Sequence, residues 1–129
     1  MKYLVIVFLG SLLLISCKEE NEKKIEKKED LVDIKNGLFT EYYPGKKAIK
    51  FQGRQDEEGK RDGKWVYYSE KGTELSVTTY SHGIRNGVTM VKYPTGVLNY
   101  VGEYQNDTMV GVWRTYDEKG KLLQEKVYE

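Results

Sequence analysis

The chain has 129 residues, and its 21 Lys and Arg against 20 Asp and Glu give a net charge of +1 at neutral pH. A nucleic-acid binder needs a basic stripe that neutralises phosphates, whereas the 14 basic and 13 acidic residues after Lys35 are interspersed. The local basic pair Lys46-Lys47 is typical of a solvated turn. The charge pattern therefore excludes nucleic acid as a partner.

The first residues have the pattern of a secretory leader. Lys2 provides a positive start, an apolar stretch runs from Leu4 to Ile15, and Ser16-Cys17 follows. About a dozen apolar residues are too few for a helix that crosses roughly 30 Å of hydrocarbon, which needs about 20. We therefore predict a signal peptide over residues 1–16.

The end of this leader, Leu14-Ile15-Ser16-Cys17, resembles the lipobox of bacterial lipoproteins. The resemblance implies that the Cys17 thiol is diacylated, that the preceding peptide is removed, and that the new amino terminus receives a further acyl chain such as palmitate. Cys17 is the only cysteine, so the chain can form no internal disulfide. The alternative is a free thiol within an uncleaved leader. Because each buried CH₂ contributes about 0.8 kcal/mol, several acyl chains would hold the mature protein stably on a membrane.

The residues after Cys17 bear on location. Lys18 stands where Asp would retain a Gram-negative lipoprotein at the inner membrane, which favours the outer membrane. Lys18-Glu19-Glu20 is similar to the signal that follows the lipidated cysteine in some surface-exposed lipoproteins. An ordinary solvated segment of the tether is an equally good interpretation of these three residues. Residues 17–35 are expected to form a lipidated cysteine and a charged flexible tether, since so few apolar groups do not offset the entropy of ordering the backbone.

A period of 24 residues runs through the rest of the chain, residues 36–129. A fixed period of this length indicates one supersecondary unit that is copied and stacked. Units are expected near residues 37–55, 59–80, 83–104 and 107–128. The positions that recur are Gly63, Gly87 and Gly111; Gly72, Gly96 and Gly120; and Tyr80, Tyr104 and Tyr128.

Each unit is expected to be a β-hairpin. Segments such as Trp65–Tyr68 and Leu75–Tyr80 are rich in aromatic and β-branched residues, and the frequent glycines would interrupt a helix. The recurring glycines are assigned to turns, where a positive φ is needed. The prediction is an all-β fold in which four hairpins, or about eight strands, form one elongated antiparallel meander sheet.

This pattern resembles the MORN repeat, in the variant form found in the YwqK-type antitoxin family. The resemblance covers about residues 37–129, and it implies a protein-interaction scaffold that is sometimes lipid-associated. In the variant branch it also implies an immunity partner of a secreted toxin. The residues that carry it are Gly59, Gly63, Trp65, Tyr68 and Gly72 in one unit, and Gly111, Trp113, Tyr116 and Gly120 in another.

No catalytic, metal or cofactor site is predicted. His82 is the only histidine, and no second histidine or nearby cysteine could complete a metal site with it. The carboxylate pairs Glu57-Glu58 and Asp117-Glu118 fall in predicted turns, where they are expected to be solvated. We therefore expect a protein that is not an enzyme.

The aromatic residues are the candidates for packing or for binding a partner. Trp65, Thr89 and Trp113 are expected to form one row along the sheet, and packing is the favoured role of the tryptophans. The opposite face, with tyrosines such as Tyr67 and Tyr100, is assigned to a protein partner because tyrosine is favoured at interfaces. The full set of candidates is Trp65, Tyr67, Tyr68, Tyr80, Tyr93, Tyr100, Tyr104, Trp113 and Tyr116.

Two functions follow from these expectations. The first is a lipid-anchored, non-catalytic module that binds a protein through the sheet face, with an antitoxin or immunity role as its most specific form. The second is a structural protein of the cell envelope that uses its repeats for self-association or for contact with lipid or glycan. The sequence leaves the partner and the oligomeric state open.

Overall fold

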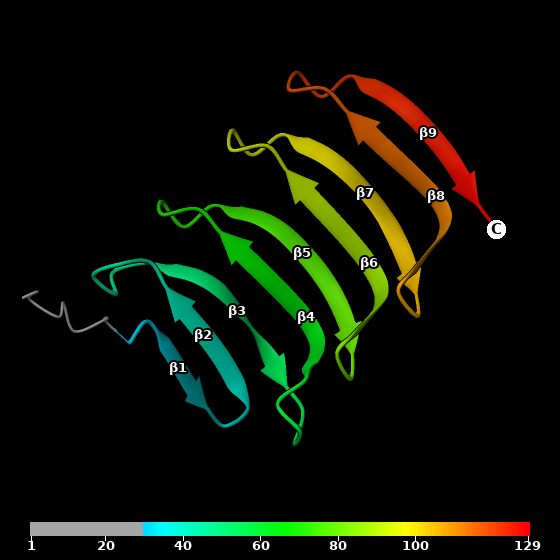
Figure 1. Ribbon diagram of the computed structural model, residues 1–129. Coiled ribbons are helices and arrows are strands. Elements are labelled where there is room, and N and C mark those ends of the chain that lie inside the picture. Colours follow the sequence, from blue (N-terminus) through cyan, green and yellow to red (C-terminus); the bar gives the residue numbers. More distant parts are fainter. Residues whose placement is uncertain (1–29) are drawn as a thin grey trace, which may run out of the picture.

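The computed structural model describes residues 30–129, which form nine β-strands in a single sheet. The strands lie in chain order from β1 to β9, and each is antiparallel to the next (Figure 1). This confirms the predicted all-β meander. The predicted signal peptide, Cys17 and most of the tether lie outside the described residues. Within residues 30–129 there is no helix with the length and apolar composition that crossing a bilayer requires.

The strand boundaries give four long hairpins preceded by one short strand. In chain order the strands are β1 (Val32–Lys35), β2 (Leu38–Tyr42), β3 (Ile49–Gln55), β4 (Arg61–Tyr68), β5 (Glu74–Ser81), β6 (Ile84–Lys92), β7 (Leu98–Gln105), β8 (Thr108–Tyr116) and β9 (Leu122–Tyr128).

The first strand, β1, lies in the segment predicted to be tether, so the sheet has one strand more than the sequence indicated. Val32 and Ile34 alternate with Asp33 and Lys35, which is the pattern of a strand with two different faces. The turn Asn36-Gly37 follows with φ values of 51° and 73°, and two successive residues at positive φ characterise a tight hairpin turn. The strand was not predicted because it is short and follows a run of charged residues, which is typical of a flexible tether.

The two ends of the hairpins carry different turns (Figure 1). At one end, which we call the wide-turn end, a glycine N–H donates to a carbonyl three residues earlier, as from Gly72 to Ser69 at 2.9 Å and from Gly120 to Asp117 at 2.9 Å. At the other end, the tight-turn end, two residues at positive φ suffice, as in His82-Gly83 and Asn106-Asp107. The turn from Asp56 to Gly59 is the exception at this end because it contains the two-residue insertion.

Three of the recurring glycines have a different role from the predicted one. Gly63, Gly87 and Gly111 lie inside β4, β6 and β8, with φ values of 77°, 114° and 66°. Each lies where the register with the preceding strand shifts, so each belongs to a β-bulge and not to a turn. A positive φ within a strand accounts for glycine at these positions. The period was read correctly, but the assignment of these glycines to turns was wrong.

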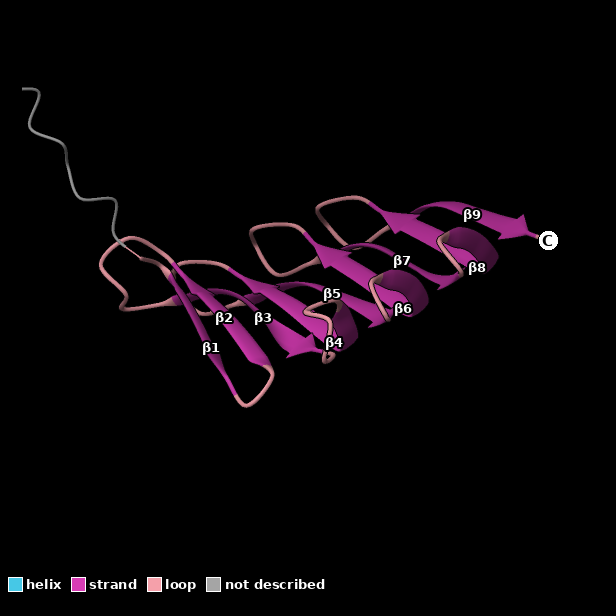
Figure 2. Ribbon diagram, turned by 60° about the horizontal axis from the view of Figure 1, so that its bottom comes forward, coloured by secondary structure: helices cyan, strands magenta, loops and turns pink. Residues whose placement is uncertain are grey.

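The sheet is a single layer with two distinct faces, and nothing described in residues 30–129 covers either of them (Figure 2). Residues directly opposite each other in the ladder share a face, so the register defines both sets. The aromatic face carries Phe39, Phe51, Trp65, Tyr67, Tyr80, Tyr100, Tyr104, Trp113 and Tyr128. The opposite face carries the row Thr40, Gln52, Val66, Val77, Met90, Val101, Arg114 and Glu125.

Candidate interaction surface

The first aromatic cluster is built around Trp65 on β4. Its indole lies over Gly53 of β3 so closely that a Cβ at Gly53 would overlap the ring. The ring centroids of Phe39 and Phe51 lie 5.4 and 4.9 Å from that of Trp65, and Trp65 Nε1 donates to the Arg54 carbonyl at 2.8 Å. Trp65 is only 2% exposed. In a sheet without a second layer, this burial is achieved by laying the indole flat against a glycine.

A cation closes the outer side of this cluster. The Arg61 guanidinium lies 4.8 Å from the centroid of Phe51 and 4.9 Å from that of Trp65, and its Nη1 donates to the Tyr80 hydroxyl at 3.1 Å. An arginine over aromatic faces is attracted by their ring quadrupoles. Arg61 itself is exposed. It therefore presents a charged group above a buried aromatic base.

A second aromatic cluster repeats the arrangement around Trp113 on β8. Its indole covers Gly102 of β7, again with no room for a Cβ, and its Nε1 donates to the Val110 carbonyl at 3.2 Å. Rings of Tyr100, Tyr104 and Tyr128 surround it at centroid distances of 6.1, 5.1 and 6.3 Å. Arg85 of β6, one period after Arg61, lies 4.1 Å from the Tyr104 centroid, and Met109 stands four residues before Trp113 where Arg61 stands before Trp65.

The strand pair β5–β6, between the two clusters, has neither the tryptophan nor the glycine that faces it. Thr89 stands at the tryptophan position of β6, and Thr78 stands opposite it on β5 where Gly53 and Gly102 stand in the other pairs. The two hydroxyls are 3.0 Å apart, and Thr89 Oγ1 also donates to the Val77 carbonyl at 3.3 Å. The sequence pattern placed Thr89 in the tryptophan row, but no prediction was made for Thr78. The signal was present, because Thr78 precedes Gly102 by one period.

Tyr67 and Tyr100 lie on the aromatic face, and their assignment to the face opposite the tryptophans was wrong. Side chains of a strand alternate, so Trp65 and Tyr67 point to the same side. Tyr100 is stacked on Trp113, and burial raises the pKa of its hydroxyl above the usual value. The tyrosines named as binding residues are therefore part of the same surface as the indoles.

Tyrosines at the wide-turn end join neighbouring hairpins. Tyr43 donates to the Tyr68 carbonyl at 2.7 Å and lies 3.1 Å from the Tyr67 hydroxyl, and this hydroxyl contact raises the pKa of Tyr43 to about 12. Tyr93 similarly donates to the Tyr116 carbonyl at 2.9 Å. These contacts give Tyr93 a structural role and leave Tyr68 and Tyr116 as acceptors through their backbone. Tyr43 was not among the candidates because it falls in the least regular unit.

The opposite face mixes charge with exposed aliphatic groups. Lys64 lies 3.6 Å and Lys92 3.8 Å from the carboxylate of Glu74. Val88 and Val112 are exposed on the same face. The opposite face therefore combines an apolar row, Val66, Val77, Met90 and Val101, with ion-paired side chains of both signs.

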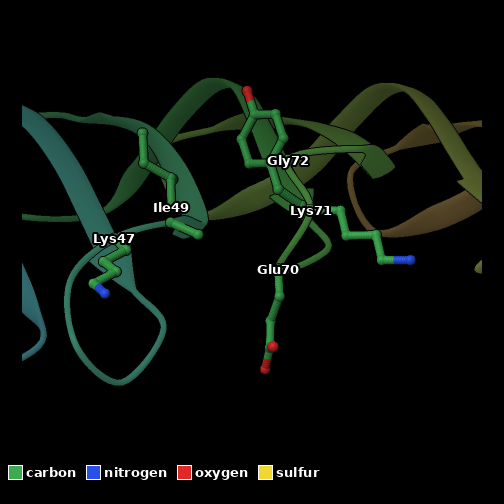
Figure 3. Close-up of a pocket in the computed structure, with 7 residues that line it drawn as sticks. Lys47, Ile49, Glu70, Lys71 and Gly72 are labelled. Atoms are coloured by element: carbon green, nitrogen blue, oxygen red, sulfur yellow. The ribbon is translucent and has the colours of Figure 1, made fainter.

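The hollow next to the basic pair Lys46-Lys47 is not an anion site. A depression of about 480 Å³ lies between two wide turns, lined by residues that include Lys47, Ile49 and Lys71. In Figure 3 the side chains of Lys47 and Lys71 extend in different directions, and Glu70 projects between them. The positive groups therefore do not converge on one point.

The tight-turn end holds the only histidine of the chain. His82 Nδ1 lies 2.8 Å from Asp56 Oδ2, while Asp56 Oδ1 accepts the backbone N–H groups of Glu58 and Lys60 at 3.0 and 2.8 Å. The contact raises the pKa of His82 and lowers that of Asp56. Across residues 30–129, no group of three or more His, Cys, Asp or Glu side chains could hold a metal ion.

One repeat later, the tight-turn end holds an ion pair between Arg85 and Asp107. Asp107 Oδ1 accepts both Arg85 Nε at 2.8 Å and the Arg85 backbone N–H at 3.0 Å. This contact lowers the pKa of Asp107. Gly83 occupies the corresponding position one period earlier, so Arg61 has no such carboxylate and turns to the Tyr80 hydroxyl instead.

These features define a tandem-hairpin repeat protein whose aromatic face is held rigid by tryptophan and glycine pairs. Residues 109–129, which comprise nearly all of β8 and all of β9, match the family of the MORN repeat variant. MORN repeats are generally modules that interact with proteins or membranes. No curated protein and no solved structure matches the chain.

Proposed function

We propose that this chain is a non-catalytic protein-interaction module that acyl groups on Cys17 hold at the outer membrane. The observation that carries the proposal is the aromatic face, a preorganised surface that no described element covers. Rigid surfaces bind with less loss of side-chain entropy than mobile ones. The leader pattern and the lipobox-like residues before Cys17 support the membrane attachment.

The partner binds the aromatic face in this proposal. Tyrosine and arginine are enriched among the residues that dominate binding energy at interfaces. Tyr67, Tyr80 and Tyr104 are only partly buried, and Arg61 is exposed above the first cluster. The tryptophans contribute by fixing this surface, because their own rings are nearly inaccessible.

A secreted toxin is the partner that the resemblance to the variant antitoxin branch favours. An immunity protein on the cell envelope would meet such a toxin before it enters the cell. The interspersed charges of the chain fit a protein partner better than a polyanion.

Two matched variants on β4 test which face binds. Arg61→Gln and Lys64→Gln each remove one positive charge, the first on the aromatic face and the second on the opposite face. A photo-crosslinking residue at each position in the full chain on native cells identifies the neighbouring protein. We expect a specific adduct at position 61 and none at position 64, and weaker capture of that protein by Arg61→Gln alone.

Equal adducts at both positions, or capture unchanged in Arg61→Gln, would contradict binding at the aromatic face. The anchor is tested separately by fractionation of cells that produce Cys17→Ser. This variant should leave the membrane fraction, whereas a chain that stays there would show that Cys17 is not the attachment point.

A further inference from the structure

The two edges of the described sheet are unequal. At one edge β1 has four residues, while at the other edge β9 has seven, Leu122–Tyr128. Six of the seven β9 residues are exposed. A free edge strand presents unpaired backbone N–H and C=O groups that another strand can pair with. Of the two edges, β9 is the one long enough to form a ladder.

The usual devices that protect an edge strand are weak in β9. The strand contains no proline, and both of its charged side chains are engaged within the sheet. Glu125 Oε2 accepts Arg114 Nε of β8 at 2.8 Å, and Lys126 Nζ lies 4.5 Å from the Tyr128 ring centroid. Two aliphatic side chains of β9, Leu123 and Val127, are 61% and 66% exposed. Within the described sheet β9 pairs only with β8, and its other edge therefore carries exposed apolar side chains.

The sequence of β9 is symmetric in chemical character about its central residue. It reads Leu-Leu-Gln-Glu-Lys-Val-Tyr, with Glu125 in the middle. Polar Gln124 and Lys126 flank the centre, aliphatic Leu123 and Val127 come next, and large apolar residues end the strand. An antiparallel partner with the same sequence, in full overlap, would place each side chain opposite one of its own kind.

We propose that β9 pairs antiparallel with β9 of a second copy of this chain, about a two-fold axis that passes beside Glu125. Leu123 then faces Val127 of the second copy, and Gln124 faces Lys126 of the second copy. The two sheets join into one continuous sheet. This contact is isologous, so it closes at a dimer and does not propagate into a filament.

The two adjacent two-fold registers are less favourable. An axis beside Gln124 would set Leu123 against Glu125 of the second copy, and an axis beside Lys126 would set two lysines against each other. Both leave an apolar side chain facing a charged one. The register about Glu125 has one like-charge contact, between the two Glu125 side chains, and each of these carboxylates already has Arg114 as a partner on its own sheet.

The dimer is compatible with a partner on the aromatic face. The axis is perpendicular to the sheet, so the aromatic faces of both copies lie on the same side, and pairing uses backbone groups at the edge. The two surfaces are therefore independent. Binding at the aromatic face could fail while the dimer forms, and the reverse also holds.

Disulfide trapping in the full chain tests this register. With Cys17 changed to Ser, Glu125→Cys places the single thiol opposite its own copy, where the Cα atoms of facing residues are about 4.5–5.5 Å apart and a disulfide can close. Gln124→Cys is the matched control, since its copy lies two residues along the strand, beyond the roughly 7 Å limit. Ile34→Cys on β1 controls for the other edge. We expect oxidation to give a covalent dimer with Glu125→Cys and little with either control.

The association itself is tested with a charge at the edge. Val127→Lys should weaken the dimer at least tenfold in sedimentation equilibrium, while Ile34→Lys, also at an exposed aliphatic site, should leave it unchanged. Both sites are exposed, so both variants should keep the native circular dichroism spectrum, and Val127→Lys should lose only the stabilisation that dimer formation itself provides. Equal trapping at positions 34 and 125, no trapping at 125, a native chain that stays monomeric, or an adduct of position 125 with a different protein would each overturn the proposal.

Discussion

The strand pairs β3–β4 and β5–β6 occupy neighbouring places in one sheet, yet they fill the same position of the aromatic face differently. In β3–β4 a large indole lies on a bare glycine, Trp65 on Gly53. In β5–β6 two small hydroxyls face each other, Thr78 and Thr89, and Thr89 is only 3% exposed. Both solutions bury the position, the first by aromatic area and the second by hydrogen bonding.

The comparison shows that the repeat varies in pairs of facing residues. An indole needs the space that only glycine leaves opposite, so a tryptophan cannot be exchanged without regard to the residue across the ladder. The pair β7–β8 returns to the first solution with Trp113 on Gly102. In the middle of the sheet, the hydroxyl contact between Thr78 and Thr89 thus replaces the packing of an indole on a glycine. The two kinds of pair should differ in how much each contributes to the free energy of unfolding.

The largest effect is expected from removal of an indole. Trp65→Ala should lower the free energy of unfolding by about 3–5 kcal/mol, because it leaves a cavity under Phe39, Phe51 and Arg61. Thr89→Ala at the equivalent position should cost only about 1 kcal/mol, the net value of its hydrogen bonds. Urea denaturation of both variants measures this. Equal losses would mean that the two solutions are energetically alike.

A methyl group under the indole should have the next largest effect. Gly53 has an ordinary negative φ, so Gly53→Ala strains no backbone angle and acts only by pushing the Trp65 ring aside. Such overpacking costs about 1–3 kcal/mol. The matched variant Thr78→Ala, where a Cβ is already present, should cost less. In a Trp65→Ala background Gly53→Ala should be harmless, and a persistent loss there would locate the strain elsewhere.

The Thr78–Thr89 pair of β5–β6 can be converted into a tryptophan and glycine pair like those of the two clusters. Thr89→Trp alone should destabilise the sheet because Thr78 blocks the seat of the ring, and adding Thr78→Gly should recover part of the loss. The coupling in a double-mutant cycle is expected to be about 1–3 kcal/mol. Calorimetric melting of the native chain, both single variants and the double variant provides it. Strict additivity would show that the two positions change independently.

The sequence predicted the architecture because its glycine and aromatic spacing is regular over three units. Five aromatic residues of the two clusters were among the predicted site candidates: Trp65, Tyr80, Tyr100, Tyr104 and Trp113. Phe39, Phe51 and Tyr128, which complete the clusters, were not. The prediction placed Tyr67 and Tyr100 on the wrong face, although the alternation of side chains along a strand was sufficient to place them. The bulge glycines were misassigned because a turn and a bulge both require a positive φ, and periodicity alone does not distinguish them.

Other features depend on contacts that no local pattern contains. The seating of Trp65 on Gly53 joins two strands across the two-residue insertion, which breaks the period at that point. The contact between Asp56 and His82 joins a turn to another turn 26 residues later. Such pairs follow from the register of the ladder, and the register becomes known only when the strands are placed side by side.

The smallest effect concerns pH at this contact, which belongs to the inserted turn and has no counterpart in the later units. The raised pKa of His82 means that its contribution is fully present below the ordinary value of 6.5 and is lost as pH rises through the folded-state pKa. The lowered pKa of Asp56 means that its contribution is present above the ordinary value of 3.8 and is lost as pH falls through the folded-state pKa. The ion pair should therefore stabilise the turn most at pH values between 3.8 and 6.5.

NMR titration of His82 should show its pKa return toward 6.5 in Asp56→Asn and stay raised in Glu57→Gln, which removes a neighbouring carboxylate that does not contact the ring. An unchanged pKa in Asp56→Asn would mean that the ion pair does not fasten the inserted turn in solution.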